Sequence, residues 1–219
     1  MESLIVTKEI DLWDSVFNIN KKEANTKKEN ENKINNRIYE IAIFKIFVKF
    51  EVFLSNMFII YATGNASGSG YIAKRKLNFI DESHLKAVLK SNNKFIDYSD
   101  KIVSLSKHIF EDKKNPFDLI FLDSDYQNYY NKIKALRNYI AHESDESKTK
   151  YIKEVLCNKN FIEPYEHLTQ INKRSSKSNY SIYVEKIREM TEIIYSPSEY
   201  LGEDTIEEKT IEEKSNVKI

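Results

Sequence analysis

Glycine and proline are scarce in this chain, and their scarcity is the strongest limit on what it can fold into. The 219 residues include 4 glycines and 3 prolines, fewer turn-forming residues than a sheet-rich domain usually needs. Apolar residues instead recur at spacings of three and four, the repeat of an amphipathic helix. We therefore expect an all-α protein, a helical bundle with short peripheral helices, which at this length can bury a core without disulfides or metal.

The charge balance bears on nucleic-acid binding, and the cysteine content bears on the redox setting. Basic and acidic residues number 34 each, so the net charge is zero. This balance argues against a tight, non-specific DNA binder but not against an enzyme that touches a few phosphates. The single cysteine excludes an internal disulfide and favours a reducing, cytoplasmic setting, and the first residues do not resemble a signal peptide.

The longest apolar stretch, residues 41–61, predicts a buried helix. It contains Lys45, Lys49 and Glu51, and charges at that depth would be costly in a bilayer. A membrane-spanning helix is therefore the less favoured interpretation.

The chain divides into three predicted segments: an N-terminal segment with a polar linker (1–33), a helical domain (34–197) and a flexible charged tail (198–219). In the first, Leu12, Trp13, Val16 and Phe17 predict one or two amphipathic turns. Residues 20–33 are either a solvated linker or the polar start of the next helix. The tail carries a tandem Thr-Ile-Glu-Glu-Lys repeat at 205–214 that is too short for a solenoid.

Apolar spacing, N-cap residues and prolines predict where the helices of the domain begin and end. Asp81 or Ser83 and Ser124 are suitable N-caps, Asn115-Pro116 breaks the chain, and Pro197 stops the last helix. The expected helices span about 34–62, 98–110, 124–142, 148–157, 164–171 and 180–195, with one more that follows a cap at Asp81 or Ser83 and runs through Leu85, Val88 and Leu89.

One of these helices carries a polar arc that suits catalysis. With Arg137 at zero on a helical wheel, Ala141 falls at about 40°, Asn138 at about 100° and His142 at about 140°. The apolar Ile133, Leu136 and Ile140 fall between about 260° and 320°. The helix therefore has a core face, a separate Arg–Asn–His arc and a small residue inside that arc. Asn138, four residues before His142, is expected to hold the imidazole in one tautomer.

These residue types suit cleavage of RNA by its own 2′-OH. Histidine titrates near neutral pH and can act as general base or general acid. The Arg137 fork can bind the negative charge that gathers on phosphate oxygens in the transition state. No cofactor is expected, and no metal either, because the four histidines are scattered and no metal-ligand spacing is present.

The run Arg137-Asn138-x-x-Ala141-His142 resembles the Arg-x4-His motif of the HEPN superfamily. That resemblance implies a HEPN-like helical bundle and a metal-independent endoribonuclease that leaves a 2′,3′-cyclic phosphate. It implies a homodimer with the active site at its interface, and a role as a toxin or antiviral defence effector with an antitoxin or other regulatory protein as partner. It also implies an alternative, because some members are inactive modules that bind RNA or protein. Ser144 departs from the subgroup whose motif is Arg-x4-His-x-Tyr.

Glu51 is a further candidate, because a carboxylate amid so much apolar surface needs a partner. As in some HEPN nucleases, it could pair with Arg137 or orient His142; the alternative is an edge residue bonded locally. The candidates for RNA contact are two residues of the motif helix and two of a basic loop: Lys134, Tyr130, Lys173 and Arg174. Tyrosines before the motif can stack bases or pack in the core, and the basic loop can meet phosphates or be a solvated turn.

Overall fold

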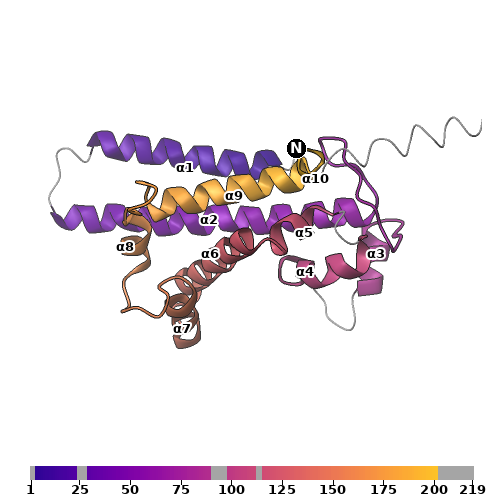
Figure 1. The fold of residues 1–219 in the computed structure, drawn as a ribbon. Helices are drawn as coiled ribbons and strands as arrows, with labels where there is room; N and C mark the ends of the chain where they lie inside the picture. The colour runs from indigo at the N-terminus through magenta and orange to yellow at the C-terminus, as the bar shows by residue number, and fades with distance from the viewer. Residues whose placement is uncertain (1–2, 24–28, 90–97, 112–114, 202–219) are drawn as a thin grey trace, which may run out of the picture. The chain divides into compact units, whose positions relative to one another are not determined.

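The computed structural model of the protein describes residues 3–23, 29–89, 98–111 and 115–201. Its helices are α1 (Ser3–Glu23), α2 (Glu29–Ala62), α3 (Glu82–Leu89), α4 (Tyr98–Ile109), α5 (Pro116–Phe121), α6 (Ser124–His142), α7 (Asp145–Glu154), α8 (Pro164–Thr169), α9 (Asn179–Tyr195) and α10 (Ser198–Leu201) (Figure 1). These residues contain isolated β-bridges but no strand. The prediction of an all-α protein is confirmed.

The chain forms two compact units. Unit 1 comprises Met1–Phe53 with Asp123–Thr191, and unit 2 comprises Leu54–Leu122 with Glu192–Ile219. The boundary thus falls inside α2 and inside α9. The boundaries that we predicted after residues 33 and 197 do not coincide with this division and remain a prediction.

Unit 1 is built around α1, the first part of α2, and α9, which run side by side (Figure 1). An aromatic cluster joins the three helices: Phe17 of α1 stacks on Tyr39 of α2 at 4.3 Å, and both meet Tyr180 of α9 edge-on at 5.2 Å. Arg188 of α9 adds an exposed ion pair with Asp11 of α1 at 3.0 Å. Aromatic burial of this kind supplies most of the packing energy between such helices.

Helix α6 is fixed in unit 1 by its apolar face. Ile133 and Leu136 are fully buried, and Tyr130 packs on Phe47 of α2 with ring centroids 5.6 Å apart. Tyr129 meets Tyr183 of α9 edge-on at 6.2 Å. This packing fixes the rotation of α6 about its axis and therefore the directions of the side chains on its other faces.

Unit 2 has its own aromatic core. Phe58 of α2, Phe110 and Phe117 lie with their ring centroids 5.7 to 5.8 Å apart. Near the C-terminus of α2, Arg75 donates a 3.1 Å hydrogen bond to the carbonyl of Ala62. Its guanidinium fills the space beside Gly64, where a Cβ would clash. Arg75 and Gly64 together end α2 close to the predicted position.

The predicted N-terminal turns are instead the 21-residue helix α1. The predicted stripe was only partly right: Phe17 is buried, whereas Leu12 is exposed. The buried stripe runs through Val6, Ile10 and Phe17, whose spacings of four and seven are helical. Of the two alternatives for residues 20–33, the polar start of the next helix is confirmed from Glu29 onward, whereas residues 20–23 belong to α1. Residues 24–28 lie outside the described part.

Other helix boundaries also needed correction. Asn115-Pro116 begins helix α5 rather than only breaking the chain: the Asn115 side chain accepts from the N–H of Asp118, and proline occupies the first turn. Asp123, not Ser124, caps α6. Helix α7 begins at Asp145, three residues earlier than predicted.

Residues 198–201 of the predicted tail form α10, and the tandem repeat lies outside the described residues. None of the described helices carries an apolar stretch long enough to cross a membrane.

Candidate functional site

Helix α6 carries three of the candidate catalytic side chains and ends at one of them. Asp123 caps its start by accepting from the N–H groups of Asp125 and Tyr126, and the buried face sets its rotation. At the other end Glu143 takes the left-handed conformation, with φ of 46°, and its N–H bonds to the carbonyl of Tyr139. This turn stops the helix immediately after His142.

Arg137 faces helix α2 within unit 1. Its Nη2 donates to Oε2 of Glu51 at 2.9 Å, and the two side chains are 25% and 13% exposed. The guanidinium also lies 5.7 Å from the centroid of the Phe44 ring, within cation–π range. Pairing with Arg137, one of the alternatives predicted for Glu51, is observed; the part of Glu51 in catalysis remains a prediction.

Asn138 orients Arg137. Nη1 of Arg137 donates to Oδ1 of Asn138 at 2.8 Å, a charge-assisted bond that a neutral amide–imidazole bond cannot easily outcompete. The hydrogen bond that we predicted between Asn138 and His142 is absent from the described side chains. Nε of Arg137 is buried and has no hydrogen-bond partner in the described part of the chain, an uncommon and costly state for a buried donor.

His142 is exposed, as is its neighbour Ala141. Beside His142 lies a hollow of about 180 Å³, which Asn138 also lines. The far side comes from the first turns of α7, where Ser144 and Ser147 form a reciprocal capping box. The His142 imidazole is therefore accessible, near the point where α6 is followed by α7 (Figure 1).

The hollow also contains a cation that the sequence analysis missed. Lys150 lines it and forms an exposed 2.9 Å ion pair with Glu146, one helical turn earlier. The hydrogen bond from Lys150, and then its charge, lower the pKa of the Glu146 carboxyl. Ser144 followed by Ser147 was the available signal, since a cap at Ser144 sets the start and register of α7. With the helix begun at residue 148, Lys150 was not recognised as a neighbour of His142.

The four predicted RNA-contact residues differ in exposure and position. Tyr130 is only 5% exposed and packs on Phe47, which is the packing alternative; its contact with RNA remains a prediction. It precedes Arg137 by seven residues, two helical turns, and so faces α2 as Arg137 does. Lys134 is partly exposed over the Tyr130 ring. Lys173 and Arg174 are exposed in the loop between α8 and α9, and neither lines the hollow beside His142.

Within one chain, Arg137 and His142 do not share a surface. Five positions on a helix separate them by about 7.5 Å along the axis and about 140° around it. Arg137 turns towards α2, whereas His142 is open to water. Among the described residues, no group of three or more His, Cys, Asp and Glu side chains is placed to hold a metal ion.

Comparison of the chain with protein-family models, curated proteins and solved structures finds no match. Function must therefore be inferred from the chemistry of these side chains. They offer an accessible imidazole, a lysine in the same hollow and an arginine held by a carboxylate and an amide. Such a set can transfer protons and bind phosphate oxygens.

Proposed function

We propose that the protein is a metal-independent endoribonuclease of the HEPN type with a HEPN-like helical bundle. The observation that carries the proposal is the placement of His142, exposed at the end of α6 in a hollow that also holds Lys150. Arg137, held by Glu51 and Asn138, gives further support, because its guanidinium is a group that binds phosphate oxygens.

In the proposed reaction, the 2′-OH of the RNA attacks the adjacent phosphorus. A histidine removes the hydroxyl proton, and a protonated group donates a proton to the departing 5′-oxygen; His142 suits either role. Arg137 stabilises the negative charge on the non-bridging oxygens. The products are a 2′,3′-cyclic phosphate and a 5′-hydroxyl, and no net proton is consumed.

The reaction requires a second copy of the chain. One α6 directs Arg137 and His142 to different sides, so a phosphate held by both needs groups from two protomers. The exposed Ala141 presents the smallest side chain in the polar arc, which allows two α6 helices to approach closely. We therefore propose a homodimer whose interface contains both copies of the motif.

The test is RNA cleavage by the pure protein in the presence of a chelator. We expect the wild-type protein to cut, and His142→Ala to reduce the rate by about 10²–10⁴-fold. His108→Ala is the matched control, because His108 is an exposed histidine on α4 in unit 2. Equal cleavage by wild type and His142→Ala would reject the proposal.

Mixing two inactive variants tests the dimer. Combined Arg137→Ala and His142→Ala subunits would regain cleavage if each site uses Arg137 of one copy and His142 of the other. Arg137→Ala must first be shown to fold, since it leaves Glu51 without this partner. A monomer that cleaves RNA at every concentration would contradict the proposed interface.

A second candidate is a non-catalytic module that binds RNA or protein in a defence complex. It is favoured by the engagement of Arg137, which is tied to Glu51, Asn138 and Phe44. Tight RNA binding without cleavage, unchanged by His142→Ala, would support this module. Toxicity on expression that disappears in the His142→Ala variant would instead support the enzyme, as a toxin or antiviral effector controlled by an antitoxin.

A further inference from the structure

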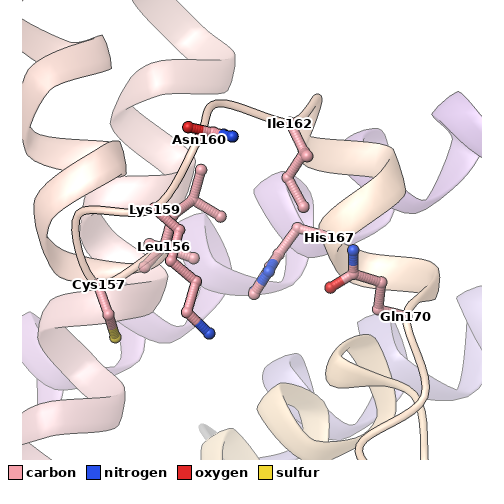
Figure 2. A pocket seen from close by; sticks show the side chains of 8 residues that line it. Leu156, Cys157, Lys159, Asn160, Ile162, His167 and Gln170 are labelled. Carbon is pink, nitrogen blue, oxygen red and sulfur yellow. The ribbon is translucent and has the colours of Figure 1, made fainter.

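Two pockets of unit 1 are similar in size but differ in how their buried polar groups are satisfied. One, of about 670 Å³, is lined by the turn after α7 and by α8 (Figure 2). Its buried histidine, His167, already shares a 2.8 Å hydrogen bond with the Tyr183 hydroxyl. The other, of about 620 Å³, is lined by α1, α2, the loop after α8 and the first turn of α9. Both volumes are inside the range of small-molecule sites, but only the second pocket is lined by a tyrosine with an unsatisfied hydroxyl.

The unsatisfied group is the hydroxyl of Tyr180 in α9. Tyr180 lines the pocket and is 5% exposed, and its hydroxyl has no hydrogen-bond partner in the described part of the chain. Other buried tyrosines have one, since Tyr61 donates to the carbonyl of Ile194 and Tyr151 to that of Ile162. A buried donor without a partner is uncommon and costly. An acceptor on a bound ligand would remove that cost.

Asp14 lies where a ligand would reach this hydroxyl. Burial first, and then the Asp14 carboxylate, raise the pKa of the Tyr180 hydroxyl, so the group stays protonated and can donate. The hydroxyl is covered in the structure, so a lining side chain must move to expose it. The Asp14 side chain also lines the pocket and is 53% exposed, and exposed side chains change rotamer readily.

The two charged groups of the lining have partners outside it. Asp14 pairs with Arg188 at 3.4 Å, and Lys177 pairs with Glu185. The lining therefore contains one carboxylate and one ammonium, which balance. An anionic ligand would compete with Glu185 for Lys177, and a cationic ligand would compete with Arg188 for Asp14. The pocket favours a ligand without net charge.

The other polar groups of the lining are mainly hydroxyls. Ser178 and Ser181 share a 2.9 Å hydrogen bond between their Oγ atoms, and Ser176, Thr169 and Asn18 add three more polar side chains. A hydroxyl group donates and accepts at the same time. This lining therefore suits a ligand that itself carries several hydroxyl groups.

The apolar part of the lining is mainly aromatic. Tyr39 is partly exposed and stacks on Phe17, and Tyr180 meets both rings edge-on. The C–H face of a sugar ring is apolar and packs on the face or edge of an aromatic ring, while its hydroxyl groups point outward to polar side chains. A sugar ring thus matches both the aromatic and the hydroxyl side of the pocket.

The loop that forms one wall is held by its own backbone bonds. Ile171 and Ser178 form a β-bridge, and the N–H of Asn172 donates to the carbonyl of Lys177 at 2.8 Å. A wall fixed in this way loses little conformational freedom when a ligand binds. The site is preorganised on the loop side.

We infer that this pocket binds a neutral sugar, with a ring face on Tyr39 and ring hydroxyls bonded to Tyr180 and Asp14. The sugar is either a free saccharide or the end of a larger glycan. The pocket shares no lining residue with the hollow beside His142. The inference therefore goes beyond the ribonuclease proposal and is tested separately from it.

Trp13 provides a native reporter of occupancy. It is the single tryptophan of the chain, it precedes Asp14, and its ring lies 6.5 Å from that of Phe17. Glucose, galactose, N-acetylglucosamine and the linear trisaccharides of glucose and N-acetylglucosamine are titrated separately, by calorimetry and by Trp13 emission. We expect at least one to bind at roughly 0.1–10 mM and to change the emission with the same half-saturation. Tighter binding of a trisaccharide than of its monosaccharide identifies a glycan end, and the reverse identifies a free sugar.

Two variants and a control test the assignment of groups. Tyr180→Phe should weaken sugar binding about fivefold to tenfold without lowering the urea midpoint of the ligand-free protein, because the hydroxyl has no partner to lose. Asp14→Asn should weaken binding about threefold to tenfold. Asp11→Asn is the matched control, since Asp11 also pairs with Arg188, at 3.0 Å, but does not line the pocket. It should leave binding unchanged.

Several outcomes would overturn the inference. One is the absence of a saturable response to every sugar up to about 100 mM. Another is tighter binding of glucose 6-phosphate, serine or a ribonucleoside than of every neutral sugar, because charge or a base would then be the recognised feature. A urea midpoint lowered by Tyr180→Phe would contradict the unsatisfied hydroxyl. Each of these failures leaves the His142 assays untouched, and loss of RNA cleavage leaves the sugar titrations untouched.

Discussion

Two histidines of unit 1 lie at opposite ends of α7 in opposite surroundings. His142 is exposed and lines a small hollow with Lys150. His167 is buried against Tyr183, and burial lowers its pKa to about 4. An accessible imidazole can exchange protons with a substrate, whereas a neutral, packed one can only recognise and support. The same residue type is thus free to exchange protons at one end of the helix and is a packed, neutral hydrogen-bonding group at the other.

Substituting each histidine in turn gives the largest expected effect, because one substitution should affect cleavage and the other stability. His142→Gln should reduce RNA cleavage by about 10²–10⁴-fold while changing the free energy of unfolding by less than about 0.5 kcal/mol. His167→Asn should do the reverse, destabilising by about 1–3 kcal/mol because Tyr183 loses its buried partner. Cleavage rates and urea denaturation of both variants measure this. A stable His167→Asn protein that has lost cleavage would break the comparison.

The second test follows the protonation of His167. Its pKa is lowered from 6.5 in the unfolded chain to about 4 in the fold, so between these values the unfolded chain binds more protons. Stability from this group is therefore complete above pH 6.5 and is lost as the pH falls towards 4, by about 2–4 kcal/mol. Urea denaturation across this window measures the loss. His167→Asn should flatten the profile, and an unchanged profile in that variant would contradict the stated cause.

Arg137 is partly exposed, between exposed His142 and buried His167. Its removal should give a third, smaller effect, on stability. Removing it leaves Glu51, which is 13% exposed, without this ion pair, so Arg137→Ala should destabilise the protein by about 1–3 kcal/mol. Glu51→Gln keeps the shape and a hydrogen-bond acceptor and should cost less. Denaturant unfolding of both variants measures the difference. A stability of Arg137→Ala equal to that of wild type would show that the pair does not hold α6 on α2.

The smallest expected effect concerns Lys150, which lines the hollow beside His142. Lys150→Gln should lower kcat/KM for RNA by about threefold to tenfold, because an exposed cation contributes modestly to phosphate binding. Lys153→Gln, on the same helix but outside the hollow, is the control. Raising the salt concentration should reduce the difference between wild type and Lys150→Gln. Equal losses in both variants would indicate a general effect of charge.

Sequence patterns predicted the parts of the fold in which caps and apolar spacing agree. Helices α6 and α9 carry clear stripes and were placed within a residue or two. Pairing of Glu51 with Arg137 was among the predicted alternatives, because an isolated carboxylate on an apolar helix needs a partner. Helix α5 was missed because Asn-Pro can either end one helix or cap the next.

Tertiary packing explains the remaining failures at the candidate site. Tyr130 can face solvent or core according to the position of α2, which the sequence of α6 does not contain. Lys150 joins His142 only through the Ser144 turn, and a three-residue error in the start of α7 conceals this. His167 bonds to Tyr183 of α9, and a contact between separate helices leaves no local sequence pattern.

The most direct measurement is the analysis of RNA end groups after cleavage in chelator by the wild-type and His142→Ala proteins. Attack by the 2′-OH predicts 2′,3′-cyclic phosphate and 5′-hydroxyl ends from the wild-type protein, and about 10²–10⁴-fold less product from the variant. Products with 5′-phosphate ends, or equal amounts of cyclic phosphate from both proteins, would contradict the account.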